Sequence, residues 1–348
     1  MPASSLLRAV ASAFALVSIT FVTGVAGAAT LRVPQQYPTI QAAVDAASDG
    51  DRIVVGRGRH CGATLTKRVK LDGRNNARII GCSTGPALAN GARIGFYLPG
   101  VKGVNPASGS RIRGFVFDGR GVGNANLEPL ALGVFSRFAS DVVVSRNYFR
   151  GTVQAITNTA GDRWLIKHNR IKGLTVFDCT RLCSGGDGIV IQLASGSLGA
   201  PGGNAAAINR PEENAVVGNH IEGAAPDGFA TFSMAGVLLL SADHTTVLDN
   251  LLELRDNPAA AAVGQAILVS NTCCGSATAF LPGSRFTTLA FNDGRKSEVA
   301  IVVEGGGGTN TEGLLLHRNR GLARIEGEEV PALAARRAAP PPLAQPLM

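Results

Sequence analysis

Basic side chains recur at matching positions in two neighbouring stretches of this sequence. Residues 142–151 (VVVSRNYFRG) and 164–173 (WLIKHNRIKG) superpose, with Asn147 aligned on Asn169. If that offset is one structural repeat, stacked repeats bring together five basic side chains: Arg146, Arg150, His168, Arg170 and Lys172. No Asp or Glu falls within the two stretches. The pattern therefore predicts a basic patch without a compensating negative charge.

Such a patch has the composition needed for β-elimination of a uronic acid residue. This reaction needs a base and a cation that neutralises the sugar carboxylate, and Lys or Arg can be the base when other cations flank it. We expect Arg170 or Lys172 to act as the base. At the same catalytic site, Arg146 and His168 would contact the uronate, and Arg150 would extend the binding surface. The alternative interpretation is a solvated basic face that binds nothing.

Hydrolysis of a glycosidic bond would need two carboxyl groups instead. They lie about 5–5.5 Å apart in retaining enzymes and about 6.5–9.5 Å apart in inverting ones. No pair of Asp or Glu occupies equivalent positions of the aligned stretches. Asp187 and Asp227, each followed by Gly, are the best catalytic candidates in loops, although Asp-Gly is also ordinary turn chemistry. Elimination is therefore favoured over hydrolysis.

The charge balance indicates the kind of partner. The chain has 33 Lys and Arg against 25 Asp and Glu, and a second basic cluster lies within residues 51–80. The expected partner is an acidic polysaccharide or another surface polyanion. Nucleic acid is disfavoured because only 5% of the residues are aromatic and because export is expected. No cofactor is indicated; calcium is compatible with a lyase, but no ligand cluster is visible.

A repeated Asn defines the elements that must position these side chains. Six aligned units each contain one: Asn147, Asn169, Asn219, Asn250, Asn292 and Asn319. Each has an aliphatic residue three positions before it, and two of the spacings between successive Asn are much longer than the others. Units of about 20–30 residues indicate a stacked solenoid of short β-strands, in which the two longest spacings would hold two units each. We expect each Asn to adopt the left-handed conformation at a corner and to hydrogen-bond to the Asn of the next unit.

An amphipathic helix is predicted ahead of the repeats. Thr39 can cap its N-terminus. One face has the i, i+3, i+4 and i+7 spacing of apolar residues, at Ile40, Ala43, Val44 and Ala47. Because the first unit of a solenoid exposes its apolar interior, this helix would cover that end.

Three segments of the N-terminal part carry a family resemblance. The stretches YPTIQAAVD (37–45), GDRIVV (50–55) and VKLDG (69–73) resemble the opening of proteins of the pectin-lyase-like superfamily. The Asn units are similar to later turns of that fold, so the resemblance covers residues 31–325. It implies an all-β, right-handed parallel β-helix and extracellular proteins that cleave, modify or bind polysaccharides. None of the catalytic signatures of the methylesterase, polygalacturonase, epimerase or pectate lyase branches is present.

Residues 1–28 have the layout of a secretory signal peptide, with one charge, an apolar run and small residues at the end. No later stretch reaches the roughly 18 apolar residues of a spanning helix, so the mature chain is expected to be secreted or periplasmic, without a membrane span. A single β-helix domain would occupy residues 29–330, with loop insertions near 174–215 and 253–288. The Pro- and Ala-rich residues 331–348 are typical of a disordered tail.

Six cysteines in an exported chain favour disulfides. The separation of Cys61 and Cys82 is close to one unit, so they could bridge adjacent turns of the solenoid. Cys179 and Cys183 could bond to each other and pin the first long loop, or bond across to the cysteines of the second. A zinc site is not indicated, because this pair lacks a matching pair of Cys or His ligands.

Together, these features predict an exported β-helix protein that binds or depolymerises an acidic polysaccharide. The alternative is a non-catalytic surface or periplasmic protein with an interaction or structural role, which the missing catalytic signatures favour. The two hypotheses differ in their products, because only elimination would release an unsaturated sugar.

Overall fold

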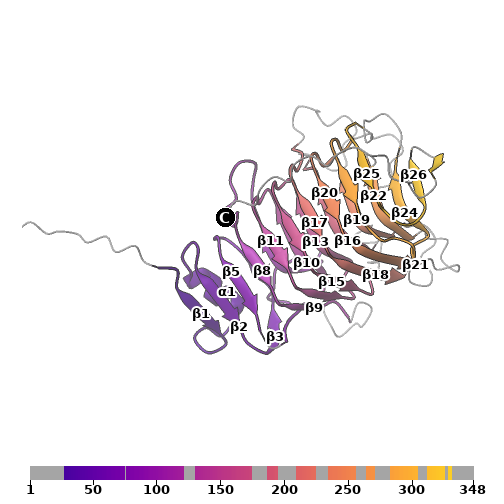
Figure 1. Ribbon diagram of the computed structural model, residues 1–348. Helices are drawn as coiled ribbons and strands as arrows, with labels where there is room; N and C mark the ends of the chain where they lie inside the picture. Colours follow the sequence, from indigo (N-terminus) through magenta and orange to yellow (C-terminus); the bar gives the residue numbers. More distant parts are fainter. Residues whose placement is uncertain are drawn as a thin grey trace, which may run out of the picture.

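In the computed structural model, the chain winds into a solenoid of three β-sheets whose strands follow one another along the molecule (Figure 1). The structure describes residues 27–74, 76–120, 130–174, 186–194, 209–224, 234–255, 264–270, 283–304, 312–325 and 328–330. The paired strands are parallel, except for the last pair, which is antiparallel. The predicted right-handed parallel β-helix is thereby confirmed.

The three sheets are named A, B and C. In spatial order, sheet A contains β1 (Thr30–Val33), β2 (Arg52–Val55), β5 (Lys70–Gly73), β8 (Arg111–Arg113), β11 (Val143–Ser145), β14 (Leu165–Lys167), β17 (Ala215–Val217), β20 (Thr246–Leu248), β23 (Thr288–Ala290) and β25 (Leu315–His317). Sheet B contains β3 (Gly58–Cys61), β6 (Ala77–Ile80), β9 (Val116–Asp118), β12 (Tyr148–Arg150), β15 (Arg170–Lys172), β18 (His220–Ala224) and β21 (Leu251–Arg255). Sheet C contains β4 (Ala63–Thr64), β7 (Arg93–Leu98), β10 (Leu130–Arg137), β13 (Gln154–Thr159), β16 (Asp187–Gln192), β19 (Met234–Leu240), β22 (Gly264–Ser270), β24 (Val299–Val303), β26 (Ala323–Ile325) and β27 (Glu328–Val330).

One turn of the solenoid takes one strand from each sheet, as β11, β12 and β13 do. Successive side chains of a strand point to opposite faces of its sheet, so each short strand sends one or more side chains inward. In sheet A the inward residues form a fully buried aliphatic column: Val144, Ile166, Val216, Val247 and Leu289. Stacked turns therefore bury together the apolar side chains that no single turn could bury alone.

The six repeated Asn residues form a ladder at the corner between sheets A and B. Each of the first five side-chain amides donates to the carbonyl oxygen of the next Asn side chain at 2.9–3.1 Å, as predicted. The expected left-handed conformation is wrong by one position, since φ is positive at the preceding residues: Arg146, His168, Gly218, Asp249, Phe291 and Arg318. The corner residue turns outward, and the following Asn points into the interior to reach its neighbour.

The two longest Asn spacings are single turns, contrary to the sequence-based expectation of two units each. The Asn169 amide donates directly to Asn219 at 3.0 Å across the first of these spacings. The second, from Asn250 to Asn292, is likewise closed by one amide contact of 2.9 Å. The stretch 174–215 contains β16 and the stretch 253–288 contains β22, so each supplies a strand of sheet C to its turn.

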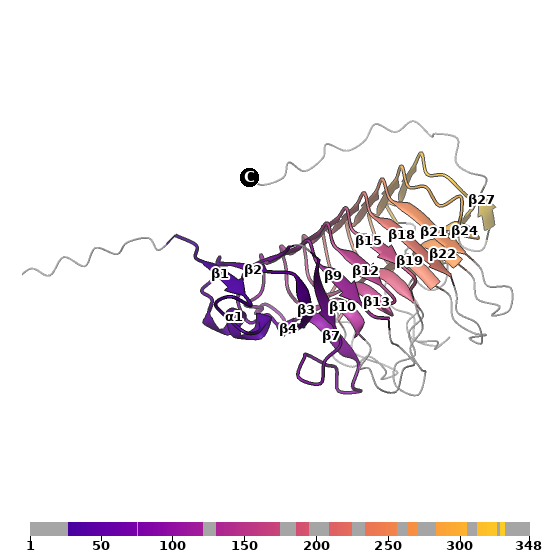
Figure 2. The same ribbon diagram turned by 90° about the horizontal axis from the view of Figure 1, so that it is seen from below.

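The predicted N-terminal helix is present as α1 (Ile40–Ala46). The Thr39 side chain accepts a hydrogen bond from the Ala42 N–H at 3.1 Å, which satisfies one of the free donors of the first turn. The buried residues of α1 face β1, β2 and β4, at the start of the solenoid (Figure 2). That the helix serves as a cap for this end stays a prediction.

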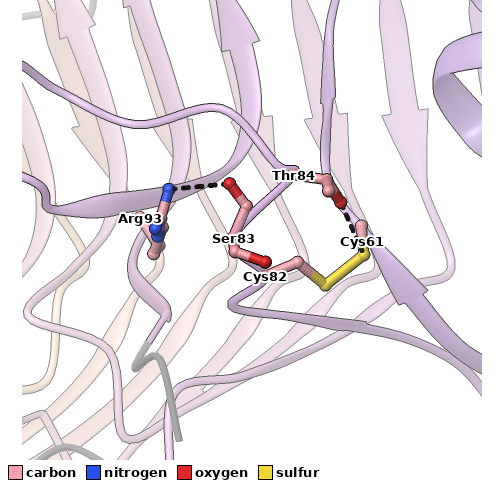
Figure 3. Close-up of a disulfide and its surroundings, with 5 residues drawn as sticks. All are labelled: Cys61, Cys82, Ser83, Thr84 and Arg93. Atoms are coloured by element: carbon pink, nitrogen blue, oxygen red, sulfur yellow. Dashed lines mark hydrogen bonds between the residues drawn. A yellow bond between two sulfur atoms is a disulfide. The ribbon is translucent and has the colours of Figure 1, made fainter.

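A disulfide joins Cys61 and Cys82, as the sequence spacing suggested (Figure 3). Cys61 ends β3 and Cys82 follows β6 of the next turn, and their Cα atoms lie 5.5 Å apart. Cys179, Cys183 and the two cysteines of the second loop lie outside the described residues, as do residues 1–26 of the expected signal peptide and the expected tail. Within the described ranges, no helix has the length and apolar character needed to cross a membrane.

Candidate functional site

The outer face of sheet A gathers cations from four of five successive strands, β2, β5, β8 and β14, and from the corner after β11. The side chains on either side of each inward residue point outward, so they form two columns along the solenoid. The first column runs through Arg52, Lys70, Arg111 and Val143. The second runs through Asp72, Arg113, Ser145 and Lys167.

These columns line a groove of about 510 Å³, here called the cationic groove. Its lining is Arg52, Lys70, Asp72, Arg111, Arg113, Val143, Ser145, Arg146, Lys167 and His168. Six Lys and Arg side chains and one His therefore share the groove with one carboxylate. Two of the residues selected from the sequence, Arg146 and His168, lie here.

The single carboxylate of the groove is engaged by two of its cations. Asp72 forms ion pairs with Arg52 and Arg113 and is almost fully buried. Burial raises the pKa of Asp72, but the hydrogen bonds from Arg113 and Arg52 outweigh it, so the pKa lies below its ordinary value. The remaining Lys and Arg side chains of the groove have no ion pair among the described residues: Lys70, Arg111, Arg146 and Lys167.

Two residues of the cationic groove lie at the corner between sheets A and B. Arg146 and His168 have φ values of 55° and 53°, and both are exposed. The next corner position is Gly218, where an added Cβ would lie 2.8 Å from His168 Nδ1. The absence of a side chain there leaves room for the His168 imidazole, which lies over the Gly218 backbone.

The other basic residues selected from the sequence lie on the adjacent sheet B and are paired with carboxylates. Arg150 contacts Asp118 at 2.6 Å. Arg170 and Lys172 contact Glu222 at 3.0 and 3.1 Å. The expectation of a patch without negative charge is therefore wrong, because neighbouring turns supply the acids.

The pKa values of these acids reflect the pairing. Burial raises the pKa of Asp118, but the hydrogen bonds from Arg120 and Arg150 have the larger effect and bring it down to about 2. Burial also raises the pKa of Glu222, but the hydrogen bonds from Lys172 and Arg170 outweigh this effect and bring the pKa below its ordinary value. Both acids are thus held as carboxylates against their cations.

Asp187 lies on sheet C, whereas the two basic groups lie on sheets A and B. It is the first residue of β16 in sheet C, in register with Gln154 and Ala235 of the neighbouring strands. Its exposed fraction is 7%, so it is a buried strand residue rather than a loop residue. Asp227 lies outside the described residues.

A carboxylate pair one turn apart does occur on sheet B. Glu222 and Glu253 are in register on β18 and β21, outside the two stretches that the sequence alignment superposes. Glu253 is paired with Lys296 at 2.7 Å, so both acids already hold cations. Within the described part of the chain, no group of three or more His, Cys, Asp or Glu could hold a metal ion.

Sequence reasoning missed three cations of the groove. Lys167 directly precedes His168 and stacks on Ser145, which the alignment of the two stretches could have shown. Arg111 and Arg113 belong to a turn without the repeated Asn. In that turn, Phe115 occupies the position that the Asn has in later turns. The backbone N–H of Phe115 donates to the Asn147 side-chain oxygen at 3.1 Å.

No family model matches this chain, and no curated protein matches it. Among solved structures, it is similar to an alginate lyase from Paenibacillus sp. str. FPU-7, at 14% identity, covering 83% of this chain and 97% of that one, with a TM-score of 0.41. It is also similar to PfbA, a surface adhesin of Streptococcus pneumoniae, at 12% identity over 82% and 76% of the two chains, with a TM-score of 0.44. A third is the A-module of the Azotobacter vinelandii mannuronan C-5 epimerase AlgE4, at 13% identity over 80% and 88%, with a TM-score of 0.31. The fold assignment rests on the three parallel sheets of this chain, independently of these likenesses.

Proposed function

We propose that this protein is an exported β-helix protein that binds an acidic polysaccharide along the cationic groove. The observation that carries the proposal is the set of four groove cations without an ion pair among the described residues. Unpaired cations on adjacent strands repel one another, and a bound polyanion relieves that repulsion.

The dimensions of the groove suit a polymer rather than a single anion. The cations span the strands from β2 to β14, which is four steps of about 4.8 Å, or about 19 Å along the axis. A linear chain of several uronate residues would meet a cation at each turn of the solenoid. The corner cations Arg146 and His168 would then contact carboxylates from the side.

The binding test compares two triple variants that remove equal charge. The groove variant replaces three unpaired cations by Ala: Arg111, Arg146 and Lys167. The matched control replaces three paired cations of sheet B by Ala: Arg150, Arg170 and Lys172. Dissociation constants are measured with pectate, alginate, hyaluronan and chondroitin.

The groove variant should lose at least about 30-fold in affinity, because each lost contact is a charge-assisted interaction. The control should lose less than about 3-fold. An equal loss of affinity in both variants would show that net charge alone drives binding. Unchanged affinity in the groove variant would show that the polymer does not bind in the cationic groove.

A second candidate function is β-elimination in the same groove. His168 is an exposed imidazole beside Arg146 and Lys167, so a base and cations for the uronate carboxylate lie together. The base would remove the proton next to the carboxylate, and the electron pair would form a double bond and expel the glycosidic oxygen, which takes a proton from water. The base role moves from Arg170 and Lys172 to His168, because the first two form ion pairs with Glu222 on sheet B, whereas His168 lines the groove.

Ultraviolet absorbance of the unsaturated product tests this candidate. Activity on one polymer that His168→Asn abolishes would support elimination. Binding without any product would favour the non-catalytic surface or periplasmic protein instead. N-terminal sequencing of the protein recovered outside the cytoplasm tests export, with cleavage expected after Ala28.

A further inference from the structure

A second hollow lies further along the same corner and begins two strands beyond the cationic groove. It measures about 720 Å³ and is here called the corner pocket. Its lining is Asp249, Asn250, Leu251, Phe291, Asp293, Arg318, Asn319 and Arg320. These residues come from the corners of the last three described turns, after β20, β23 and β25.

Phe291 is an unusual residue for its position in this pocket. It stands at the corner with a φ of 56°, a conformation that bulky side chains rarely adopt, and 45% of it is exposed. The equivalent corner positions of the other aligned turns hold polar residues or glycine: Arg146, His168, Gly218, Asp249 and Arg318. Neither backbone preference nor core packing therefore explains an aromatic ring at this corner position.

Two side chains of the following turn contact the Phe291 ring. The Arg318 guanidinium lies 5.8 Å from the Phe291 centroid, and the His317 ring meets it edge-on at 5.1 Å. Asp249, Phe291 and Arg318 occupy successive corner positions, so Arg318 covers the ring on the side of the following turn. Phe291 and Asp249, from the preceding turn, both line the corner pocket.

The polar side chains of the corner pocket balance in charge. Two carboxylates, of Asp249 and Asp293, and two guanidinium groups, of Arg318 and Arg320, line the pocket together. Asp293 also pairs with Arg295 at 2.7 Å, and Arg320 approaches it at 3.7 Å. A pocket with no net charge, two acceptors and two planar donors suits an uncharged ligand with many hydroxyl groups.

We propose that the corner pocket binds a neutral pyranose unit. The apolar C–H face of the sugar would pack on Phe291, and exposed Leu251 would contact its edge. Asp249 would accept hydrogen bonds from sugar hydroxyls, while Arg320 would donate to them. This site goes beyond the proposed function, since it differs from the cationic groove in place, charge and ligand.

The test uses two phenylalanines that share the same backbone strain. Phe286 has a φ of 53° and an exposed fraction of 44%. It lies just before β23, whereas Phe291 follows β23, and it stacks on His244 outside the corner pocket. Asn tolerates the left-handed conformation, so Phe291→Asn and Phe286→Asn should both fold. Binding of cellohexaose, mannohexaose, maltohexaose and xylohexaose is measured by calorimetry and by saturation-transfer NMR.

We expect at least one of these neutral oligosaccharides to bind the unaltered protein. Phe291→Asn should weaken that binding at least about 10-fold, and Phe286→Asn should change it less than about 2-fold. Pectate or alginate binding should be unaffected by Phe291→Asn, which separates this site from the cationic groove. No binding by the unaltered protein, or equal losses in both variants, would overturn the proposal. Concentration-dependent dimerisation that Phe291→Asn abolishes would also overturn it, in favour of contact between two copies of the chain.

Discussion

The outer faces of sheets A and B come from the same turns, yet their charges are organised differently. On sheet B, carboxylates take up the neighbouring cations: Asp118 with Arg78, Arg120 and Arg150, Glu222 with Arg170 and Lys172, and Glu253 with Lys296. On sheet A, one carboxylate serves two of six Lys and Arg side chains in the cationic groove. The acids on adjacent turns, rather than the basic residues themselves, decide which cations are free to meet a ligand.

The difference has an energetic meaning. Paired charges on sheet B add modestly to the stability of the stacked turns, since exposed pairs contribute roughly 0–1 kcal/mol each. The sheet A cations that have no ion pair among the described residues work against the stacking, so a chain optimised for stability alone would not keep them. Four predictions test this comparison, from the largest expected effect to the smallest.

Breaking the Asn ladder should damage both faces together. Asn169 is 2% exposed, donates to Val144 and Asn219, and accepts from Asn147. Asn169→Ala would leave several buried polar groups unpaired, so the free energy of unfolding should fall by about 3–5 kcal/mol. Chemical denaturation measures this change. Asn319→Ala, at the partly exposed last rung, is the control and should lose less than half as much. Equal losses would mean that burial of the ladder is unimportant.

Adding an acid to sheet A should make the cationic groove resemble sheet B. Ser145 lies between Arg113 and Lys167 in the outward column. Ser145→Asp would pair with these cations and repel a polyanion, so affinity for the preferred polymer should fall about 30-fold, or about 2 kcal/mol. Ser145→Asn has nearly the same shape without the charge and should change affinity less than about 3-fold. If the two variants behave alike, shape and not charge controls the groove.

The same comparison shows how far the sequence could predict the molecule. The fold followed from the aliphatic residue and the Asn that recur in each unit, because both are fixed by stacking with adjacent turns. The cationic groove was only half visible: Arg146 and His168 were found, but Arg111 lies in a turn where Phe115 replaces the Asn. The pairing of Arg170 with Glu222 could not be seen at all.

The physical reason is the variable length of the turns. Register is obvious in a short turn such as the one from Asn147 to Asn169, but Lys172 and Glu222 are far apart in the sequence and adjacent in space. Only the direct contact between Asn169 and Asn219 reveals that this long stretch is a single turn. When a turn contains a long loop, the sequence does not show which charges become neighbours. The strands stack in the same way whatever the length of the loop.

Removing an acid from sheet B should show in the pH dependence of stability. Asp118 has a folded-state pKa of about 2, below the ordinary 3.8, so its pairs stabilise the fold above about pH 4 and lose this effect as the pH falls toward 2. After allowance for solvent screening, Asp118→Asn should lower the free energy of unfolding by on the order of 1 kcal/mol near neutral pH and by much less near pH 2. Denaturation at both pH values measures this. Asp141→Asn, which breaks an exposed pair with Arg163, is the control and should have little effect at either pH. A constant difference at both pH values would contradict an electrostatic origin.

The smallest expected effect is a gain of binding on sheet B. Glu222→Gln would release Arg170 and Lys172 while keeping the size of the side chain, and so would give sheet B unpaired cations like those of sheet A. Affinity for an acidic polymer should rise about 2–3-fold at low salt, and this gain should disappear near physiological salt because the freed cations are exposed. Replacing Arg170 and Lys172 by Ala in the same variant should return the affinity to its original value. An unchanged affinity in Glu222→Gln would show that pairing is not what keeps sheet B from binding, and the distinction between the two faces would then rest on the shape of the cationic groove.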